Sequence, residues 1–200
     1  MPTSDESEKE VHLLKLAKAG RESIHLLAYA DAFDTYRMGI YRLLSRMLQD
    51  QEEAKDMLQE VFFMGWRDLS QLVNGASFRA WLFRIATNKA LEALRRRNRF
   101  WMVRVEDEEV LEFLEAMQVP GPEEQVLTKV MVEQALAKVT PSYRACILLR
   151  EDGHSQAEIA TILGCSKGSI SKMLIRATEQ FIEAYTRLEE QIRLDLERES

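Results

Sequence analysis

Apolar residues recur along this chain at the three- and four-residue spacing that is typical of amphipathic helices. The clearest stripe consists of Ile40, Leu43, Leu44, Met47 and Leu48. A second consists of Met57, Leu58, Val61, Phe62 and Leu69, and a third of Leu82, Ile85 and Leu94. No run of alternating β-branched residues predicts a strand. The pattern therefore predicts an all-α protein, with a lead-in helix over about residues 8–29 and a loop at 73–77 between the second and third stripes.

The pattern breaks after Arg104. Residues 106–124 contain eight acidic residues and no basic one, and the segment includes Pro120-Gly121-Pro122, which a helix cannot accommodate. We interpret this stretch as an acidic linker between two helical domains. The expected organisation is a lead-in helix at 1–30, a first domain at 31–104, the linker at 105–123 and a second domain at 124–200.

Helix start and stop signals organise the second domain. Thr140-Pro141 is typical of an N-cap followed by proline in the first helical position. Ser155 and Glu158 have the spacing of a capping box, and Gly164 can end that helix in the left-handed conformation. Ser166 then caps the next helix, which continues through a C-terminal helical tail. Two short helices joined by a glycine turn predict a helix-turn-helix, although a hairpin used only for packing has the same pattern.

The charge distribution excludes a uniformly basic nucleic-acid binder, because the net charge is −6. Residues 79–104 nevertheless carry a local net charge of +7, which allows a local nucleic-acid surface. No apolar run is long enough to cross a membrane, and the acidic start has no signal-peptide core. The two cysteines, Cys146 and Cys165, lack metal-site spacing. We therefore expect a cytoplasmic protein without membrane insertion.

Catalytic motifs are missing from the sequence. The three histidines are scattered, and neither a nucleophile elbow nor a phosphate-binding glycine loop occurs. We expect Cys146 to be a core residue. The sequence therefore predicts no catalytic residue, no metal site and no cofactor, and hence not an enzyme.

Two segments have residues suited to nucleic acid. One side of a predicted helix carries Trp81, Arg84 and Asn88. A ring can stack on unstacked bases, a cation can hold phosphates and an amide can hydrogen-bond a base edge. The alternative is that Trp81 is core and the arginines form a solvated face. Phe78 repeats with Leu82 on a more apolar face, which predicts that both are core residues. The second helix of the helix-turn-helix exposes a candidate major-groove surface made of Lys167, Ser169, Ser171, Lys172, Ile175 and Arg176.

Three segments occur in an order that resembles bacterial RNA polymerase sigma factors of the small extracytoplasmic-function (ECF) type. They are the "DxxQEVF" segment that starts at Asp56, the "FRAWLFRIATN" segment at 78–88 with the arginine run after it, and the helix-turn-helix at 155–177. The resemblance covers about residues 31–100 and 124–185. It implies two helical domains, a sigma region 2 bundle and a sigma region 4 helix-turn-helix, and a role in transcription initiation.

The resemblance also implies roles for particular residues. The segment that docks on the clamp helices of the polymerase's largest subunit contains Asp56, Gln59, Glu60 and Phe63. Contacts to the −10 promoter element, including a flipped base, are implied for Asn74, Gly75, Ala76, Ser77, Phe78, Trp81, Arg84, Asn88, Arg95 and Arg96. The second helix of the helix-turn-helix, the recognition helix, would read the −35 element in duplex DNA. Further implied partners are the polymerase flap and an anti-sigma factor.

The recognition helix departs from the family pattern. Ser171, Met173 and Thr178 stand where cations are usual, and Lys172 restores only one. Two other readings remain open at this point. One is a stand-alone helix-turn-helix regulator that dimerises through its first domain, and the other is an adaptor that mimics a sigma factor without binding DNA.

Overall fold

A computed structural model of the chain describes residues 22–69, 72, 77–101 and 123–199. Its described part consists of seven α-helices and no strand, which confirms the all-α prediction. The helices are α2 (Glu22–Leu48), α3 (Gln51–Asp68), α4 (Phe78–Trp101), α6 (Glu123–Lys138), α7 (Pro141–Glu151), α8 (Gln156–Leu163) and α9 (Lys167–Glu199). Among the described residues, no helix combines the length and the apolarity needed to cross a membrane.

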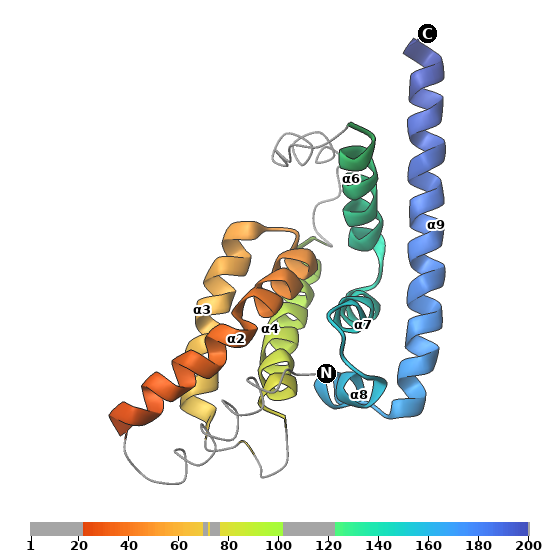
Figure 1. Cartoon of the computed structure of the whole chain (residues 1–200). Helices are drawn as coiled ribbons and strands as arrows, with labels where there is room; N and C mark the ends of the chain where they lie inside the picture. The colour runs from red at the N-terminus through yellow and green to blue at the C-terminus, as the bar shows by residue number, and fades with distance from the viewer. Residues whose placement is uncertain (1–21, 70–71, 73–76, 102–122, 200) are drawn as a thin grey trace.

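Helices α2, α3 and α4 pack together as one bundle (Figure 1). The stripe predicted on α2 is entirely buried, with exposed fractions between 0% and 4%. A tight turn separates α2 from α3: Gln49 has a positive φ of 57°, and the Asp50 side chain caps α3 by accepting a hydrogen bond from the Glu53 amide at 2.9 Å. The predicted stripes are therefore the faces that form the core.

Rings from all three helices meet in this core. Tyr29 is fully buried, and its ring lies within 6.0 Å of Phe33, Phe62, Trp66 and Phe78. The Tyr29 hydroxyl donates to the Phe62 carbonyl at 2.9 Å.

Gly65 makes this arrangement possible. A Cβ atom there would lie 2.3 Å from the Tyr29 hydroxyl oxygen, so only glycine lets α2 and α3 approach this closely.

Helix α2 runs without a break through residue 30, so residues 22–30 belong to the first bundle and not to a separate lead-in helix. The rest of the expected lead-in helix, and nearly all of the linker, lie outside the described residues.

The second domain follows its capping signals. Ser155 and Glu158 exchange both bonds of the capping box, at 2.8 and 3.3 Å, and Gly164 ends α8 with a φ of 66°. Ser166 caps α9 by accepting from the Ser169 amide at 3.2 Å. Thr140 occupies the N-cap of α7, as predicted, but its side chain makes no capping hydrogen bond.

Helix α9, with 33 residues, is the longest of the described helices, and it runs past α8, α7 and α6 (Figure 1). Its residues Ile170 and Ala177 are fully buried, whereas Leu174 is half-buried. On α6, Val130 and Met131 face the core, whereas Leu127 is 45% exposed. Helices α7 and α8 lie against the first bundle, so one continuous core joins the two domains.

Candidate nucleic-acid interface

One face of α3 is exposed and combines polar groups with a large ring. Asp56, Gln59, Glu60 and Phe63 follow each other at helical spacing, and all four are exposed. The Phe63 ring is 65% exposed, although Phe62 beside it packs into the core. A single exposed ring is common on protein surfaces, so this face is a candidate docking surface because it carries the four residues that the family resemblance implies for docking. The face also reaches α4, because Glu60 Oε2 lies 2.7 Å from Lys89 Nζ.

The start of α4 departs from one prediction. Phe78 has no exposed surface, and its ring packs 5.9 Å from both Tyr29 and Trp81. A ring enclosed by the core has no face left for a base, so the assignment of Phe78 to −10 contacts is wrong. The apolar repeat with Leu82, also fully buried, is the signal that identifies it as core.

The other α4 candidates remain at the surface. Trp81 is half-buried against the core, while Arg84 and Asn88 are exposed on the same side. Arg95 and Arg96 are exposed as well. Arg97, in contrast, has a structural role, because it donates to the Leu48 carbonyl at 2.9 Å and forms an ion pair with Glu53.

The loop before α4 is largely outside the described residues. This applies to Asn74, Gly75 and Ala76. Ser77 is described and half-buried, and its hydroxyl accepts from the Ala80 amide at 3.3 Å. It therefore caps α4 at the edge of the candidate −10 surface.

The second candidate surface lies at the start of α9. Lys167, Ser171, Lys172, Ile175 and Arg176 are exposed, and Ile175 is 60% exposed. Ser169 is half-buried, and its hydroxyl lies 2.7 Å from the Ser166 hydroxyl. Ser169 therefore takes part in the start of the helix, and the other five side chains form the outward surface.

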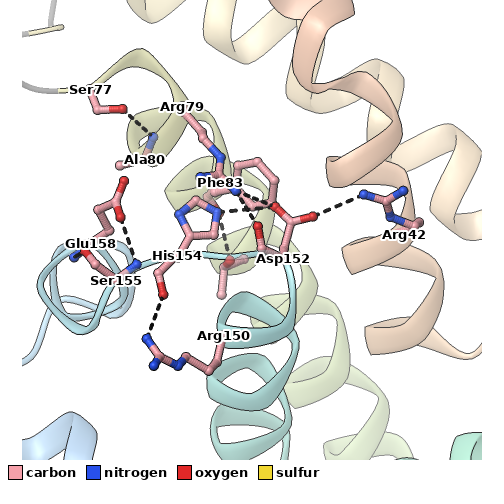
Figure 2. A network of polar contacts seen from close by, with 11 residues as sticks. Arg42, Ser77, Arg79, Ala80, Phe83, Arg150, Asp152, His154, Ser155 and Glu158 are labelled. Carbon is pink, nitrogen blue, oxygen red and sulfur yellow. Dashed lines mark hydrogen bonds and ion pairs between the residues drawn. The ribbon is translucent and has the colours of Figure 1, made fainter. Parts of the chain in front are cut away.

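A cluster that the sequence did not predict joins the two domains (Figure 2). We call it the interdomain cluster, and it consists of Arg42, Arg79, Asp152 and His154. Asp152 accepts from Arg79 Nη2 at 2.9 Å through Oδ2, and from Arg42 Nη2 at 3.3 Å through Oδ1. Arg79 Nη2 also donates to the Asp152 main-chain oxygen at 2.5 Å. Arg79 and Asp152 are only 15% and 17% exposed.

Backbone geometry at the end of α7 fixes the position of Asp152. Asp152 is the C-cap of α7, and Gly153 follows with a φ of 84°. The Gly153 amide donates to the Arg150 carbonyl and the His154 amide to the Leu149 carbonyl, each at 3.1 Å, which is the Schellman motif. The Asp-Gly pair signals a helix end in the sequence, but no pattern connects it with residues 73 and 110 positions away.

His154 completes the cluster from the second domain. Its side chain is fully buried, its ring centroid lies 4.5 Å from that of Phe83, and Nε2 is 3.6 Å from Asp152 Oδ2. Burial, followed by the nearby Arg79 charge, lowers the pKa of His154 to about 4, against the opposing influence of Asp152 and Glu158. The imidazole is therefore neutral at pH 7.

A second set of ion pairs lies beside the cluster. Arg46, at the end of α2, reaches Glu133 on α6 at 2.9 Å and Glu151 on α7 at 2.6 Å. The Arg42, Arg46, Glu151 and Asp152 side chains border a cavity of about 470 Å³ between the domains. In these pairs the first domain supplies arginines and the second supplies carboxylates.

Comparison with known families finds a match for each of the two domains. Residues 32–100 match sigma-70 region 2, and residues 129–180 match sigma-70 region 4. The RNA polymerase sigma-H factor of Pseudomonas aeruginosa is 32% identical over 157 residues, which cover 74% of this chain and 81% of that protein. The ECF RNA polymerase sigma factor SigW of Bacillus subtilis is 30% identical over 160 residues, which cover 76% and 86%.

Two solved structures share the fold. The sigma factor RpoE of Bartonella quintana, determined with the anti-sigma factor NepR, aligns with a TM-score of 0.62 at 20% identity, over 79% of this chain and 96% of that one. CnrH, determined with the cytosolic domain of CnrY, aligns with a TM-score of 0.60 at 22% identity, over 88% and 96%. A stand-alone helix-turn-helix regulator is not favoured, because the first domain also matches a sigma region. With sigma-70 regions 2 and 4 both matched and relatives of similar length aligned across them, the chain belongs to the ECF sigma factors of bacterial RNA polymerase.

Proposed function

We propose that this sigma factor docks on the clamp helices of the polymerase's largest subunit through the exposed face of α3. As an ECF sigma factor, the chain is a transcription initiation factor that binds core RNA polymerase and gives it promoter recognition. The supporting observation is that Asp56, Gln59, Glu60 and Phe63 share one solvent-exposed face. Burying the 65% exposed ring of Phe63 in a partner would supply apolar contact, and the flanking carboxylates would supply charge complementarity.

The −10 element is assigned to α4 and the loop before it. A base that leaves the duplex costs a few kcal/mol of lost stacking, which the protein must recover. The exposed edge of Trp81 offers a stacking platform, and Asn88 on the same side can hydrogen-bond a base edge. Arg84, Arg95 and Arg96 supply cations for the phosphates. We expect these stacking, base-edge and phosphate contacts together to supply the free energy of strand opening.

The −35 element is assigned to the start of α9. Lys172 and Arg176 can address guanine, and Ile175 can contact a thymine methyl group. Few cations are available, so the second domain alone binds DNA weakly, because phosphate contacts supply much of the affinity. The apolar surface of this domain is assigned to the polymerase flap. An anti-sigma factor is a further proposed partner, and the cytoplasm is the proposed location.

The docking face can be tested with matched substitutions. Phe63→Ser should weaken association with core polymerase about tenfold or more, which is the usual effect of removing a central apolar contact. Met38→Ser is the control, because Met38 is 55% exposed but lies on α2, outside the face. Association is measured by fluorescence anisotropy with labelled sigma factor. Equal effects of the two substitutions would refute the assignment.

The −10 assignment requires separate measurement of core binding and strand opening. Trp81→Ala combined with Asn88→Ala should reduce open-complex formation, followed by permanganate reactivity of unpaired thymines, and leave core association nearly unchanged. Glu92→Gln is a suitable control, since it changes an exposed position of the same helix. If core association fell as much as strand opening, these residues would be structural.

A further inference from the structure

One ion pair links the docking face of α3 to the helix that carries the −10 surface. Glu60 belongs to the docking face, and its Oε2 lies 2.7 Å from Lys89 Nζ on α4. Helices α3 and α4 pack against each other in the first bundle. Lys89 directly follows Asn88, which is assigned to the −10 surface. The pair therefore bridges two neighbouring surfaces that have different proposed ligands, the polymerase and the promoter.

The two partners of this pair differ in exposure. The Glu60 side chain is 58% exposed, whereas the Lys89 side chain is only 22% exposed. Much of the lysine stem is therefore covered by the bundle, while the ammonium meets a carboxylate that is open to solvent. Such an ion pair stabilises its partners only weakly. An external charge of the right sign can therefore replace either partner.

Glu60 differs from the other acid of the docking face. Asp56 lies one turn earlier on α3 and is exposed, and within the described ranges no basic group pairs with it. Its carboxylate can meet a basic group of a partner protein without first giving up another contact. Glu60 must first leave Lys89. Binding of a partner to this face therefore changes the surroundings of one cation on α4.

We propose that Lys89 couples core docking to promoter binding: Glu60 holds its ammonium in the free factor, and a basic group of the polymerase releases it to a promoter phosphate. The inference rests on the proposed function, because it uses both the docking face and the −10 surface. The four-carbon stem of lysine is flexible, so the released ammonium can turn from α3 towards the surface beside Asn88. There it can form a charge-assisted hydrogen bond with a phosphate oxygen.

This coupling acts in both directions. Binding of Glu60 by the polymerase and binding of Lys89 by a phosphate each require the ion pair to break. When both ligands bind, the pair breaks only once, so the first ligand lowers the cost of binding the second. By linkage, promoter DNA then strengthens core association by the same factor. That factor equals the strength of the pair, which for a partly exposed pair is up to about fivefold.

The effects of Lys89→Met have opposite signs in two assays, because the change removes the ammonium and keeps most of the stem. Association with core polymerase, measured by fluorescence anisotropy without DNA, should tighten by up to about fivefold, since Glu60 is then free. Binding of the assembled polymerase to a promoter fragment with an unpaired −10 element should weaken. The slope of log affinity against log salt should also fall by about one, because one phosphate contact is lost. Damage to the bundle would weaken both associations.

Two control variants accompany this measurement. Lys89→Arg keeps the positive charge and should restore both affinities towards those of the wild type. Arg37→Met breaks an exposed ion pair with Asp34, at 2.9 Å on α2, and should change neither affinity. Unchanged core association of Lys89→Met would overturn the competition for Glu60, and weaker association would overturn it by showing that Lys89 orients the carboxylate. An unchanged salt slope would overturn the phosphate contact.

A double-mutant cycle assigns the effect to Glu60. In a Glu60→Gln background no ion pair remains, so Lys89→Met should not tighten core association any further. Asp56→Asn is the matched comparison, because it removes an acid of the same face and leaves the pair in place, so Lys89→Met should still tighten association there. Equal tightening in both backgrounds would overturn the coupling. If Glu60→Gln and Asp56→Asn both left core association unchanged, the docking face itself would be refuted instead.

Discussion

The neutral state of the buried His154 makes the stability of this protein depend on pH. His154 belongs to the α7–α8 connection, and its imidazole is fully buried against Phe83. Burial is the main cause of its low pKa of about 4. Arg79 on α4 lowers the pKa further, while Asp152 and Glu158 act in the opposite direction. In the unfolded chain the pKa returns to the ordinary 6.5. At pH values between about 4 and 6.5, His154 is therefore protonated in the unfolded chain and neutral in the folded protein.

The size of the effect follows from proton linkage. Stability is lost as the pH falls from about 6.5 to about 4, because protonation then favours the unfolded chain. At about 1.4 kcal/mol per pKa unit, the loss reaches about 3 kcal/mol below pH 4, and about 2 kcal/mol of it is present at pH 5. Above pH 7 the histidine contributes no pH dependence.

Two measurements test this reasoning. The free energy of unfolding, from urea denaturation at pH 7.5 and pH 5, should fall by about 2 kcal/mol more in the wild type than in His154→Leu, which cannot bind the proton. Because the carboxylates titrate in both proteins, their contribution to the free energy of unfolding cancels in the difference between wild type and variant. A nuclear magnetic resonance titration, with the His154 signal identified by its loss in the variant, should give a pKa near 4. A measured pKa of 6 or above, or parallel pH profiles, would refute the account.

Three local features give further predictions, each measured as a change in the free energy of unfolding. Gly65→Ala should destabilise the first domain by about 1 to 3 kcal/mol, because the new Cβ would lie 2.3 Å from the Tyr29 hydroxyl oxygen. A cost below 0.5 kcal/mol would show that the two helices can shift apart easily. Ser155→Ala should cost about 1 kcal/mol through loss of the capping box with Glu158, and Ser142→Ala on α7 is its control. Gln49→Gly should stabilise the chain by up to about 1 kcal/mol, because residue 49 has a φ of 57°, and a decrease would show that its side-chain bond to the Arg46 carbonyl outweighs the strain.

The helices and their caps could be predicted because their causes are local. Apolar residues that recur every three to four positions predict α2 and its buried face, and the Ser155–Glu158 spacing predicts the start of α8. The repeat of Phe78 with Leu82 correctly indicated core, whereas assigning Phe78 to DNA from the family pattern did not. Where periodicity and family pattern disagreed, periodicity gave the physical environment of the side chain.

The contact between the domains could not be predicted, because its partners are far apart in the sequence. Arg79 stands in a basic segment and, judged by composition alone, belongs to the nucleic-acid surface. In the structure its charge meets Asp152, which the sequence presents only as part of a turn. A local count of charges shows where basic residues cluster in the sequence. It does not show which of them form ion pairs with an acidic residue of the other domain.

Arg144 is a second long-range contact between the domains that local patterns do not predict. Its side chain is 5% exposed, and it donates to the Met47 carbonyl in the last turn of α2 at 2.8 Å and to the carbonyls of Ala137 and Val139 at the end of α6. Burial lowers its pKa to about 10, partly offset by Glu133, so the guanidinium remains charged at pH 7. The negative ends of two helix dipoles, one from each domain, compensate that charge. The buried charge therefore favours this packing of the two domains, because its hydrogen-bond acceptors come from the ends of α2 and α6 together.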